Sequence, residues 1–360
     1  MSLTPHTIER AQMSQNPGAS RRLRLPLLTA AAVAATLALA ACGSSSDDSA
    51  PATAASSSSS SGGATETITV GVPRSFGYLS TLWARNVQPE GVKIEYKYFP
   101  VFTDMLTALN SGKIDLTEIG DVGAVQSYVN GGKVEAVAVT EPNAENCGLL
   151  VPKDSKVQTF ADLKGKKIAF LKSTNSYIAF LHQVKAAGLK ESDFHIIEIT
   201  GPPANKAFQS GQLDAYYSID PNLSDLVEKT GGREITSCKQ ANVENRYPYV
   251  ATKAAIKDKP KAVAAVVQAV ADNIAWIQAH PDEQAQLVAP KLGFSASAIK
   301  TTYARGAKAL QPADAKFYAT EQPVIDELVA AKIVTRPVKA SDVFISQFNA
   351  DTTAGAGAGS

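Results

Sequence analysis

The chain has 360 residues, of which 44% are hydrophobic and 19% are charged, and its formal net charge is +1. This length and apolar content predict a large buried core divided between about two domains. The near-neutral charge argues against nucleic acid as a partner, because a phosphate backbone selects a basic protein face.

The N-terminal 41 residues have the pattern of a secretory signal peptide. Arg21, Arg22 and Arg24 precede an apolar run over residues 25–41. A charged region followed by a short apolar region is typical of such a peptide. A transmembrane anchor would need about 20 apolar residues, and the run is shorter. We therefore predict that residues 1–41 are removed on export, and the sequence leaves both the Sec and the twin-arginine route open.

The signal peptide ends in a motif that resembles the bacterial lipobox, Leu39-Ala40-Ala41-Cys42. In a lipobox, cleavage exposes a cysteine whose thiol carries lipid, so we predict that Cys42 anchors an extracytoplasmic protein to the cell membrane. Residues 42–66 are mostly Ser, Ala and Gly and lack the apolar bulk that folding requires. They predict a flexible tether, and residues 350–360 predict a flexible tail of the same kind.

Short apolar strands alternate with helical patterns from Thr67 onward. This alternation predicts an α/β protein with mostly parallel sheets, and after about Lys259 only helices are expected. The predicted strands are 67–72, 92–98, 134–140, 167–171, 195–199 and 213–217, and the predicted helices are 104–111, 122–130, 176–188, 203–210, 261–280, 281–290, 296–309 and 319–331.

The sequence contains no motif typical of a catalytic or metal site. Its four histidines are far apart, and His-Glu-x-x-His, Gly-x-Ser-x-Gly and phosphate-loop motifs are absent. Ser297-Ala-Ile-Lys300 has the Ser-x-x-Lys spacing of some acyl-transfer enzymes but lacks their companion motifs. We interpret it as ordinary surface, and predict no enzyme activity, no cofactor and no metal.

Cys147 and Cys238 are the cysteines that remain besides Cys42. Outside the cytoplasm a disulfide can persist. Two separate buried thiols are the alternative.

A series of segments resembles the aliphatic sulfonate, taurine and nitrate binding family, in that family's order along the chain. The segments include Leu106-Thr-Ala-Leu-Asn-Ser-Gly-Lys-Ile-Asp115, Gly120-Asp-Val-Gly123, Asp162-Leu-Lys-Gly-Lys-Lys-Ile-Ala169, Phe208-Gln-Ser-Gly-Gln-Leu-Asp-Ala215 and Trp276-Ile-Gln-Ala-His-Pro-Asp-Glu283. The resemblance implies a type II periplasmic-binding-protein fold, in which two α/β lobes are joined by two crossover segments and are followed by a helical C-terminus. Its expected parts are lobe 1 at 67–140 plus 252–349, lobe 2 at 151–244, and hinge crossovers at 141–150 and 245–251.

The resemblance also implies that the ligand binds between the lobes, at strand ends and helix starts. Thr174, Asn175 and Ser176 open a predicted helix, where free N–H groups and the helix dipole attract an anion. Ordinary helix capping by the same residues is the alternative, and the two roles are compatible.

Other candidate ligand contacts lie at five further places along the chain. Asp121 is either a pocket acid or a helix cap, and Val122 replaces a hydroxyl that the family usually has. Ile219 stands where the family has a tryptophan, and Arg74 is either an anion partner or a solvated loop residue. The complete set of expected contacts adds Ser75, Phe76, Gly77, Tyr78, Thr140, Asp220, Asn222, Arg246 and Tyr247.

The resemblance predicts a monomeric solute-binding component of an ABC importer, with the permease and its ATPase as partners. The expected ligand is a small organic anion, sulfonate-like, such as an alkanesulfonate or taurine. Val122 and Ile219 favour an alternative, the binding of an aromatic carboxylate or a pyrimidine precursor on the same fold. An extracytoplasmic enzyme on this fold is the third and least favoured hypothesis.

Overall fold

The computed structural model describes residues 65–75, 77–306 and 308–354. The chain divides into two units, residues 1–60 and 61–360, and every described residue lies in the second unit. The predicted signal peptide, Cys42, nearly all of the tether and Phe76 lie outside the described residues.

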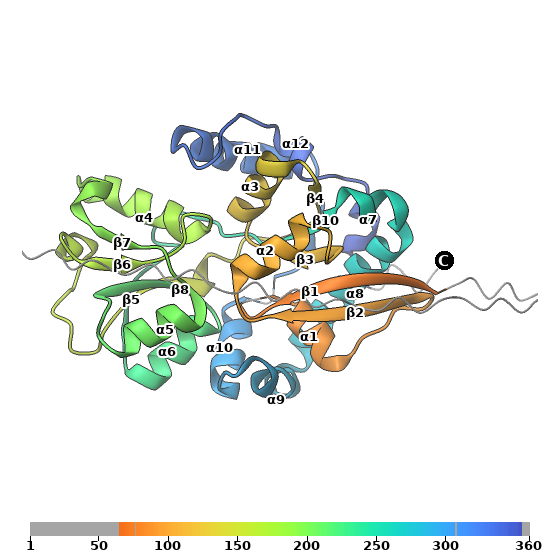
Figure 1. The fold of residues 1–360 in the computed structure, drawn as a ribbon. Coiled ribbons are helices and arrows are strands. Elements are labelled where there is room, and N and C mark those ends of the chain that lie inside the picture. The colour runs from red at the N-terminus through yellow and green to blue at the C-terminus, as the bar shows by residue number, and fades with distance from the viewer. Residues whose placement is uncertain (1–64, 76, 307, 355–360) are drawn as a thin grey trace, which may run out of the picture. The chain divides into compact units, whose positions relative to one another are not determined.

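Lobe 1 is built on a six-stranded sheet (Figure 1). Val70 and Val72 of β1 are fully buried. The strand pairs in parallel with β2 and β3, whereas β10 runs antiparallel between β3 and β4. The strands, in their order across the sheet, are β11 (Leu310–Gln311), β4 (Val134–Thr140), β10 (Pro248–Thr252), β3 (Leu116–Glu118), β1 (Glu66–Pro73) and β2 (Val92–Phe99).

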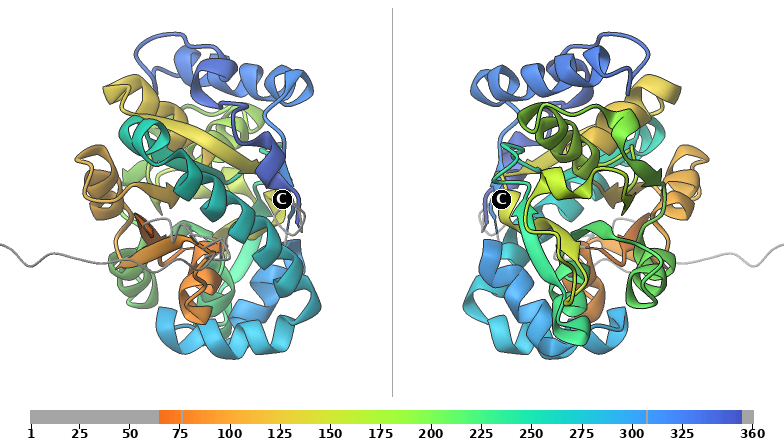
Figure 2. Two further views of the ribbon diagram at one scale, coloured as in Figure 1. Left: turned by 90° about the vertical axis from the view of Figure 1, so that its right-hand side faces the viewer. Right: turned by 90° about the vertical axis from the view of Figure 1, so that its left-hand side faces the viewer.

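The helices of lobe 1 cover both faces of this sheet. The C-terminal ones form two groups, with α9 and α10 at one end and α11 and α12 at the other (Figure 1 and Figure 2). The helices are α1 (Leu79–Arg85), α2 (Phe102–Asn110), α3 (Asp121–Gly131), α7 (Lys253–Asp258), α8 (Pro260–Ala279), α9 (Pro281–Leu292), α10 (Ala296–Gly306), α11 (Ala315–Ala330) and α12 (Ala340–Val343).

Among the described residues, α8 is the one helix long and apolar enough to cross a membrane by length and composition. Val263, Val266 and Val270 of this helix are fully buried in the lobe 1 core. The helix is therefore apolar because it packs inside the protein.

Lobe 2 repeats the topology of lobe 1 with five strands. In each sheet one strand arrives from the other lobe and runs antiparallel beside its neighbours, β10 in lobe 1 and β5 in lobe 2. The strands, in order, are β7 (His195–Ile197), β6 (Lys167–Ala169), β8 (Ala215–Ile219), β5 (Cys147–Val151) and β9 (Arg233–Ser237), and the helices are α4 (Asn175–Ala186), α5 (Gly201–Gln209) and α6 (Asn222–Thr230).

Several predicted boundaries differ from the structure. The sheets are mixed rather than mostly parallel, because β5 and β10 enter from the crossovers in the reverse direction. The C-terminal region is not purely helical, since the predicted helix 296–309 ends at Gly306 and β11 then pairs with Thr140 of β4. The fold also continues past the predicted end at 349, because a 3-10 helix spans Asn349–Thr352 and Thr352 is buried.

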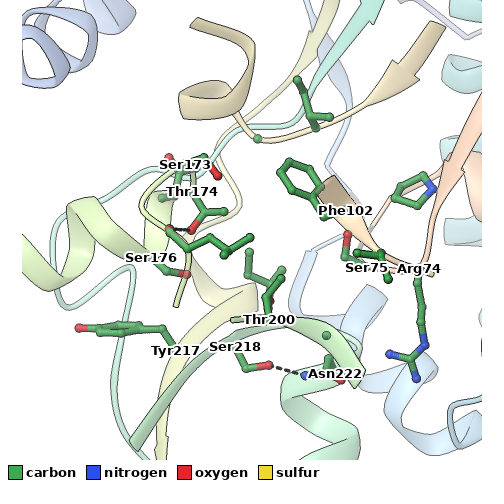
Figure 3. A pocket seen from close by; sticks show the side chains of 18 of the residues that line it. Arg74, Ser75, Phe102, Ser173, Thr174, Ser176, Thr200, Tyr217, Ser218 and Asn222 are labelled. Carbon is green, nitrogen blue, oxygen red and sulfur yellow. Dashed lines mark hydrogen bonds between the residues drawn. The ribbon is translucent and has the colours of Figure 1, made fainter. Parts of the chain in front are cut away.

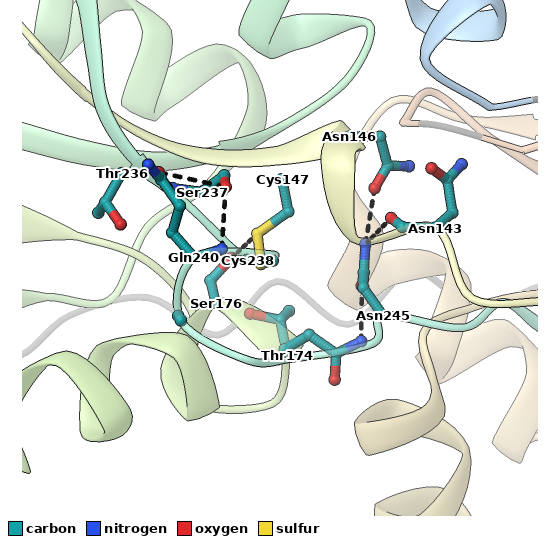
Figure 4. Close-up of a disulfide and its surroundings, with 12 residues drawn as sticks. Asn143, Asn146, Cys147, Thr174, Ser176, Thr236, Ser237, Cys238, Gln240 and Asn245 are labelled. Atoms are coloured by element: carbon teal, nitrogen blue, oxygen red, sulfur yellow. Dashed lines mark hydrogen bonds between the residues drawn. A yellow bond between two sulfur atoms is a disulfide. The ribbon is translucent and has the colours of Figure 1, made fainter.

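The first crossover is shorter than the predicted segment 141–150, because β5 begins at Cys147, whereas the second is longer than the predicted 245–251 and begins earlier, because β9 ends at Ser237. By sheet pairing they span residues 141–146 and 238–247. A disulfide joins Cys147 and Cys238 at the lobe 2 end of both crossovers, with 5.3 Å between their Cα atoms (Figure 4). The amide of Cys238 also donates to the carbonyl of Cys147 at 2.9 Å, so the two crossovers are tied where they enter lobe 2.

Candidate ligand-binding site

A cavity of about 110 Å³ lies between the lobes. Ser173, Thr174 and Ser176 stand on one wall, and Phe102 and Arg74 stand on the opposite wall (Figure 3). The lining residues are Pro73, Arg74, Ser75, Phe99–Phe102, Glu118–Gly120 and Phe294 from lobe 1, Leu171, Ser173–Ser176, Thr200, Gly201, Tyr216–Ile219 and Asn222 from lobe 2, and Asn245 and Tyr247 from the second crossover.

The start of α4 presents unused hydrogen-bond donors to this cavity. Thr174 is the N-cap in extended conformation, and its carbonyl accepts from Tyr177 at 3.0 Å. Within the described part of the chain, the backbone N–H groups of Asn175 and Ser176 have no hydrogen-bond partner. Such N–H groups, with the helix dipole behind them, favour an anion.

The hydroxyls around this helix start differ in what they can donate. Thr174 Oγ1 already donates to the Leu171 carbonyl at 2.7 Å. Ser173 has no hydrogen-bond partner among the described residues, and the hydroxyl of Ser176 has only a 4.0 Å contact with the sulfur of Cys147. Ser173 and Ser176 are therefore better placed than Thr174 to donate to an anion.

Two other helix starts at the cavity, those of α5 and α3, are less suited to negative charge. Pro202 and Pro203 remove two N–H groups from the first turn of α5, and the Gly201 amide donates to the Tyr216 hydroxyl at 3.1 Å. At α3, the buried carboxyl group of Asp121 accepts from the Val122 amide at 2.8 Å and thus occupies the helix start itself. Of these three helix starts, that of α4 is the best suited to an anion ligand.

The lobe 1 wall is mainly aromatic, with one cation at its edge. Phe99, Phe102 and Phe294 contribute rings to the lining. The half-buried guanidinium of Arg74 lies over the ring of Phe294, with 3.9 Å between Cζ and the ring centroid. Arg74 has no ion pair among the described residues, so its charge is available to a ligand.

Glu118 is the carboxyl group of this wall, and 1% of its surface is exposed. Its Oε2 accepts from the amides of Tyr78 at 2.8 Å and Leu79 at 3.4 Å, and the carboxyl group also interacts with the Tyr249 hydroxyl. Burial raises the pKa of Glu118 to about 8.

Seven of the residues predicted to contact ligand do not line the cavity. Val122 is buried in the core, and the Thr140 hydroxyl accepts from the Tyr247 amide at 3.0 Å. A Cβ on Gly77 would come within 2.5 Å of Glu118 Oε2, so the close approach there serves the protein's own carboxyl group. Tyr78 is fully buried, and its hydroxyl accepts from the Lys308 amide at 2.6 Å.

The three remaining residues of this group are charged and are used within the protein. Asp121 also accepts from the Arg246 amide at 3.2 Å, which holds the second crossover against α3. The Arg246 guanidinium pairs with Glu321 at 3.2 Å and with Glu244. Asp220 pairs with Arg305 at 3.2 Å. Buried charges require such partners, and sequence alone did not separate these charges from ligand-binding ones.

The cavity also contains residues that the sequence analysis missed. Thr200 had a usable signal, because it follows a predicted strand and precedes a helix start, as Thr174 does. Glu118 and the loop around Phe99 had none, since their exposure to the cavity depends on how the lobes meet. The lining residues not predicted are Pro73, Phe99–Phe102, Glu118–Gly120, Leu171, Ser173, Thr200, Gly201, Tyr216–Ser218, Asn245 and Phe294.

Comparison with known proteins places this geometry in a family. A model of the NMT1/THI5 like family matches residues 88–284, more than half of the chain. The chain belongs to this family.

Individual relatives extend the similarity beyond the matched segment. An Escherichia coli (strain K12) protein named as an aliphatic sulfonates-binding protein is 28% identical over 247 residues, which cover 68% of this chain and 77% of that protein. The alkanesulfonate-binding protein SsuA from Xanthomonas axonopodis pv. citri, solved with MOPS bound, is 22% identical, with a TM-score of 0.71 over 77% of this chain and 97% of that one. These matches confirm the type II periplasmic-binding-protein fold.

The same fold also occurs in an enzyme. The desulfurization enzyme DSZB is 17% identical, with a TM-score of 0.61 over 80% of this chain and 98% of that chain. Since that similarity concerns the fold alone, function has to be argued from the cavity.

Proposed function

We propose that this protein is a monomeric solute-binding component of an ABC importer that captures a small organic anion with a sulfonate-like head group. The observation that carries the proposal is the start of α4. There the backbone N–H groups of Asn175 and Ser176, which have no partner among the described residues, line the cavity together with the hydroxyls of Ser173 and Ser176. The ligand would bind between the lobes and then pass to the permease and its ATPase. Closure of two lobes around a ligand is a common domain motion in such proteins.

The donor set at α4 suits a head group with several oxygens. An anion transferred out of water needs a hydrogen bond at each buried oxygen. The two amides and the hydroxyls of Ser173 and Ser176 offer four donors in one place, whereas a planar carboxylate has two oxygens to satisfy. A sulfonate has three oxygens and matches the larger set better.

Cavity size supports a short ligand. The volume of about 110 Å³ is below the roughly 150 Å³ of an engineered cavity that accepts benzene. A short alkanesulfonate is of a size that this conformation accepts. One observation favours the alternative, an aromatic carboxylate or a pyrimidine, namely that Ile219 and three phenylalanine rings line the cavity.

A role in binding rather than catalysis fits the composition of the lining. The described lining residues include no histidine, cysteine or lysine. The hydrogen bonds that Glu118 accepts come from the backbone amides of Tyr78 and Leu79, and among the described residues none links it to a serine or threonine hydroxyl that it could activate as a base.

Titration calorimetry on the mature protein tests the proposal. The panel comprises ethanesulfonate, propionate, benzoate and a hydroxymethylpyrimidine. We expect ethanesulfonate to bind with one-to-one stoichiometry and the others at least about tenfold more weakly, a difference of about 1.4 kcal/mol. Tighter binding of benzoate or the pyrimidine would establish the alternative instead, and absence of binding by all four would reject both.

We also propose that the mature protein is anchored outside the cytoplasm through lipid on Cys42. The lipobox-like sequence Leu39-Ala-Ala-Cys42 supports this, and the disulfide is compatible with an oxidising compartment. Cys42→Ala should leave folding intact and release the protein into the soluble fraction. A variant that remains in the membrane fraction and is processed normally would contradict the anchor.

A further inference from the structure

A chain of buried asparagines joins the two crossovers (Figure 4). Asn143 and Asn146 lie in the first crossover and Asn245 lies in the second, and all three are buried. Nδ2 of Asn245 donates to Oδ1 of Asn146 at 2.7 Å and to the carbonyl of Asn143 at 3.2 Å. Nδ2 of Asn143 in turn donates to the carbonyl of Gly306, at the end of α10 in lobe 1, at 2.9 Å. The two hinge segments are therefore linked through side chains to each other and to lobe 1.

The second crossover also contacts the start of α4. Oδ1 of Asn245 accepts a hydrogen bond from Nδ2 of Asn175 at 2.6 Å, and Nδ2 of Asn245 also donates to the Tyr247 hydroxyl at 3.0 Å. A side-chain amide has two N–H donors, and those of Asn245 already share three acceptors within the protein. Although Asn245 lines the cavity, it has no donor left for an anion, so it can contribute to binding only through Asn175.

Asn175 is the residue at which the ligand site, the hinge and lobe 1 meet. Its backbone N–H group has no partner among the described residues, whereas its side chain is bonded to Asn245. The same side chain interacts with the buried carboxyl group of Asp121 at the start of α3 in lobe 1. A Cβ on Gly120 would lie 3.8 Å from Nδ2 of Asn175, so the starts of α3 and α4 meet closely. Rotation of lobe 2 away from lobe 1 would therefore change the contacts of Asn175.

The backbone of Asn245 does not by itself explain the asparagine. Its φ of 55° lies in the left-handed region, which glycine and asparagine adopt more readily than other residues. Asn242 of the same crossover has a φ of 57° and an exposed side chain. Glycine would fit the backbone at both residues, but in place of Asn245 it would remove four hydrogen bonds. The side chain of Asn245 therefore has a role beyond the backbone conformation.

We propose that Asn245 is a positioning residue that couples anion binding at the start of α4 to closure of the two lobes. This rests on the proposed function and adds the route by which a bound ligand acts on the hinge. An anion held by the backbone N–H groups of Asn175 and Ser176 fixes the start of α4, and the Asn175–Asn245 hydrogen bond transmits that position to both crossovers. Because coupling between binding and a conformational change is reciprocal, breaking this link weakens binding although it removes no ligand contact.

Asn245→Gly tests the coupling, because it keeps the left-handed backbone and removes the side chain. Titration calorimetry should show an affinity for ethanesulfonate at least about tenfold lower than that of the wild-type protein. Small-angle X-ray scattering at saturating ethanesulfonate should show a smaller decrease in the radius of gyration. Asn242→Gly is the matched control, since it makes the same change at an exposed residue with the same backbone conformation. It should match the wild-type protein in both measurements.

Asn175→Ala breaks the same link from the α4 side and keeps the backbone N–H group for the anion. It should weaken binding at least as much as Asn245→Gly does, and adding Asn245→Gly to it should cause little further loss, because residues that act through one contact are not additive. If urea titrations show that Asn245→Gly is unfolded, Asn175→Ala carries the test alone, with the same expected losses of affinity and compaction.

Three results would overturn the coupling. The first is that Asn245→Gly matches Asn242→Gly in affinity and compaction. The second is a loss of affinity in Asn245→Gly or Asn175→Ala with full compaction at saturation, which indicates a purely structural role. The third is additive losses in the variant with both changes. Failure of ethanesulfonate to bind the wild-type protein would instead reject the proposed function, and the coupling with it.

Discussion

The two walls of the cavity are made from similar lobes but carry different chemistry. The lobe 2 wall has free amides and the hydroxyls of Ser173 and Ser176 at the start of α4. The lobe 1 wall has phenylalanine rings, the buried Glu118 and, at its edge, the cation Arg74. Since the sheet topology is shared, the difference arises from residues at strand ends and helix starts. We infer that lobe 2 holds the common anionic head of a ligand and lobe 1 selects the remainder.

The largest expected effect concerns the stability of the lobe 2 side. The disulfide joins two cysteines that are 91 residues apart in sequence, and the loss of loop entropy in the unfolded chain predicts about 4.6 kcal/mol of stabilisation. Cys147→Ala with Cys238→Ala should lower the free energy of unfolding by about that amount in urea titrations. Wild-type protein under reducing conditions is the control and should behave alike. An unchanged midpoint would show that the crossovers are held by their other contacts.

The next effect separates the two walls directly. Ser173→Ala with Ser176→Ala removes two donors to a charged acceptor, each contributing about 1.5–3 kcal/mol. Ethanesulfonate affinity should fall about a hundredfold or more. Ser297→Ala, at an exposed serine of α10, is the matched control and should have no effect. Equal affinities of the double variant and the control would mean that lobe 2 does not hold the anion.

A smaller effect concerns the way in which Glu118 of lobe 1 makes the free energy of unfolding depend on pH. The folded state keeps the proton of Glu118 up to a pKa of about 8, whereas the unfolded chain loses it near the ordinary value. Stability from this group is therefore fully present at low pH and is lost as the pH rises through 8. Between pH 5 and 8 this group should lower the free energy of unfolding by at most about 1.4 kcal/mol per pH unit.

Urea titrations at pH 5, 6, 7 and 8 measure this slope. Glu118→Gln should show a shallower decline than wild-type protein. A residual decline is expected, because burial also raises the pKa of Glu321 to about 8. Parallel profiles for the two proteins would show that Glu118 is ionised in the folded state.

The smallest expected effect is that of replacing Arg74, at the edge of the lobe 1 wall. Arg74 is half-buried and lies over Phe294, so solvent screens its attraction to an anion. Arg74→Ala should weaken ethanesulfonate binding about tenfold or less at low salt, and the difference should shrink in about 1 M salt. Arg74→Lys keeps the charge and should retain part of the affinity. A loss that is independent of salt would indicate a packing role.

Sequence reasoning located the lobe 2 wall better than the lobe 1 wall, for a physical reason. Thr174, Asn175 and Ser176 follow one strand and open one helix, so a local pattern is enough to indicate their place. Glu118 lies in a strand of three residues, which has too little periodicity to be predicted. Its role depends on contacts with α1 and β10, which are distant in sequence.

The charged residues illustrate the same limit. Asp121, Asp220 and Arg246 stand in segments that resemble ligand-binding ones, yet their partners are other parts of the protein. Arg305 and Glu321 lie 75 or more positions from the groups with which they pair. A sequence shows which charges exist but not which of them are paired in the folded state.

A crystal structure of the protein with ethanesulfonate tests the central claim most directly, because it locates the head group without relying on a variant. The account predicts that the sulfonate oxygens lie within hydrogen-bond distance, about 2.7–3.2 Å, of the amide nitrogens of Asn175 and Ser176. A sulfonate bound instead beside Arg74, with the start of α4 left unoccupied, would contradict the assignment of the anion to lobe 2.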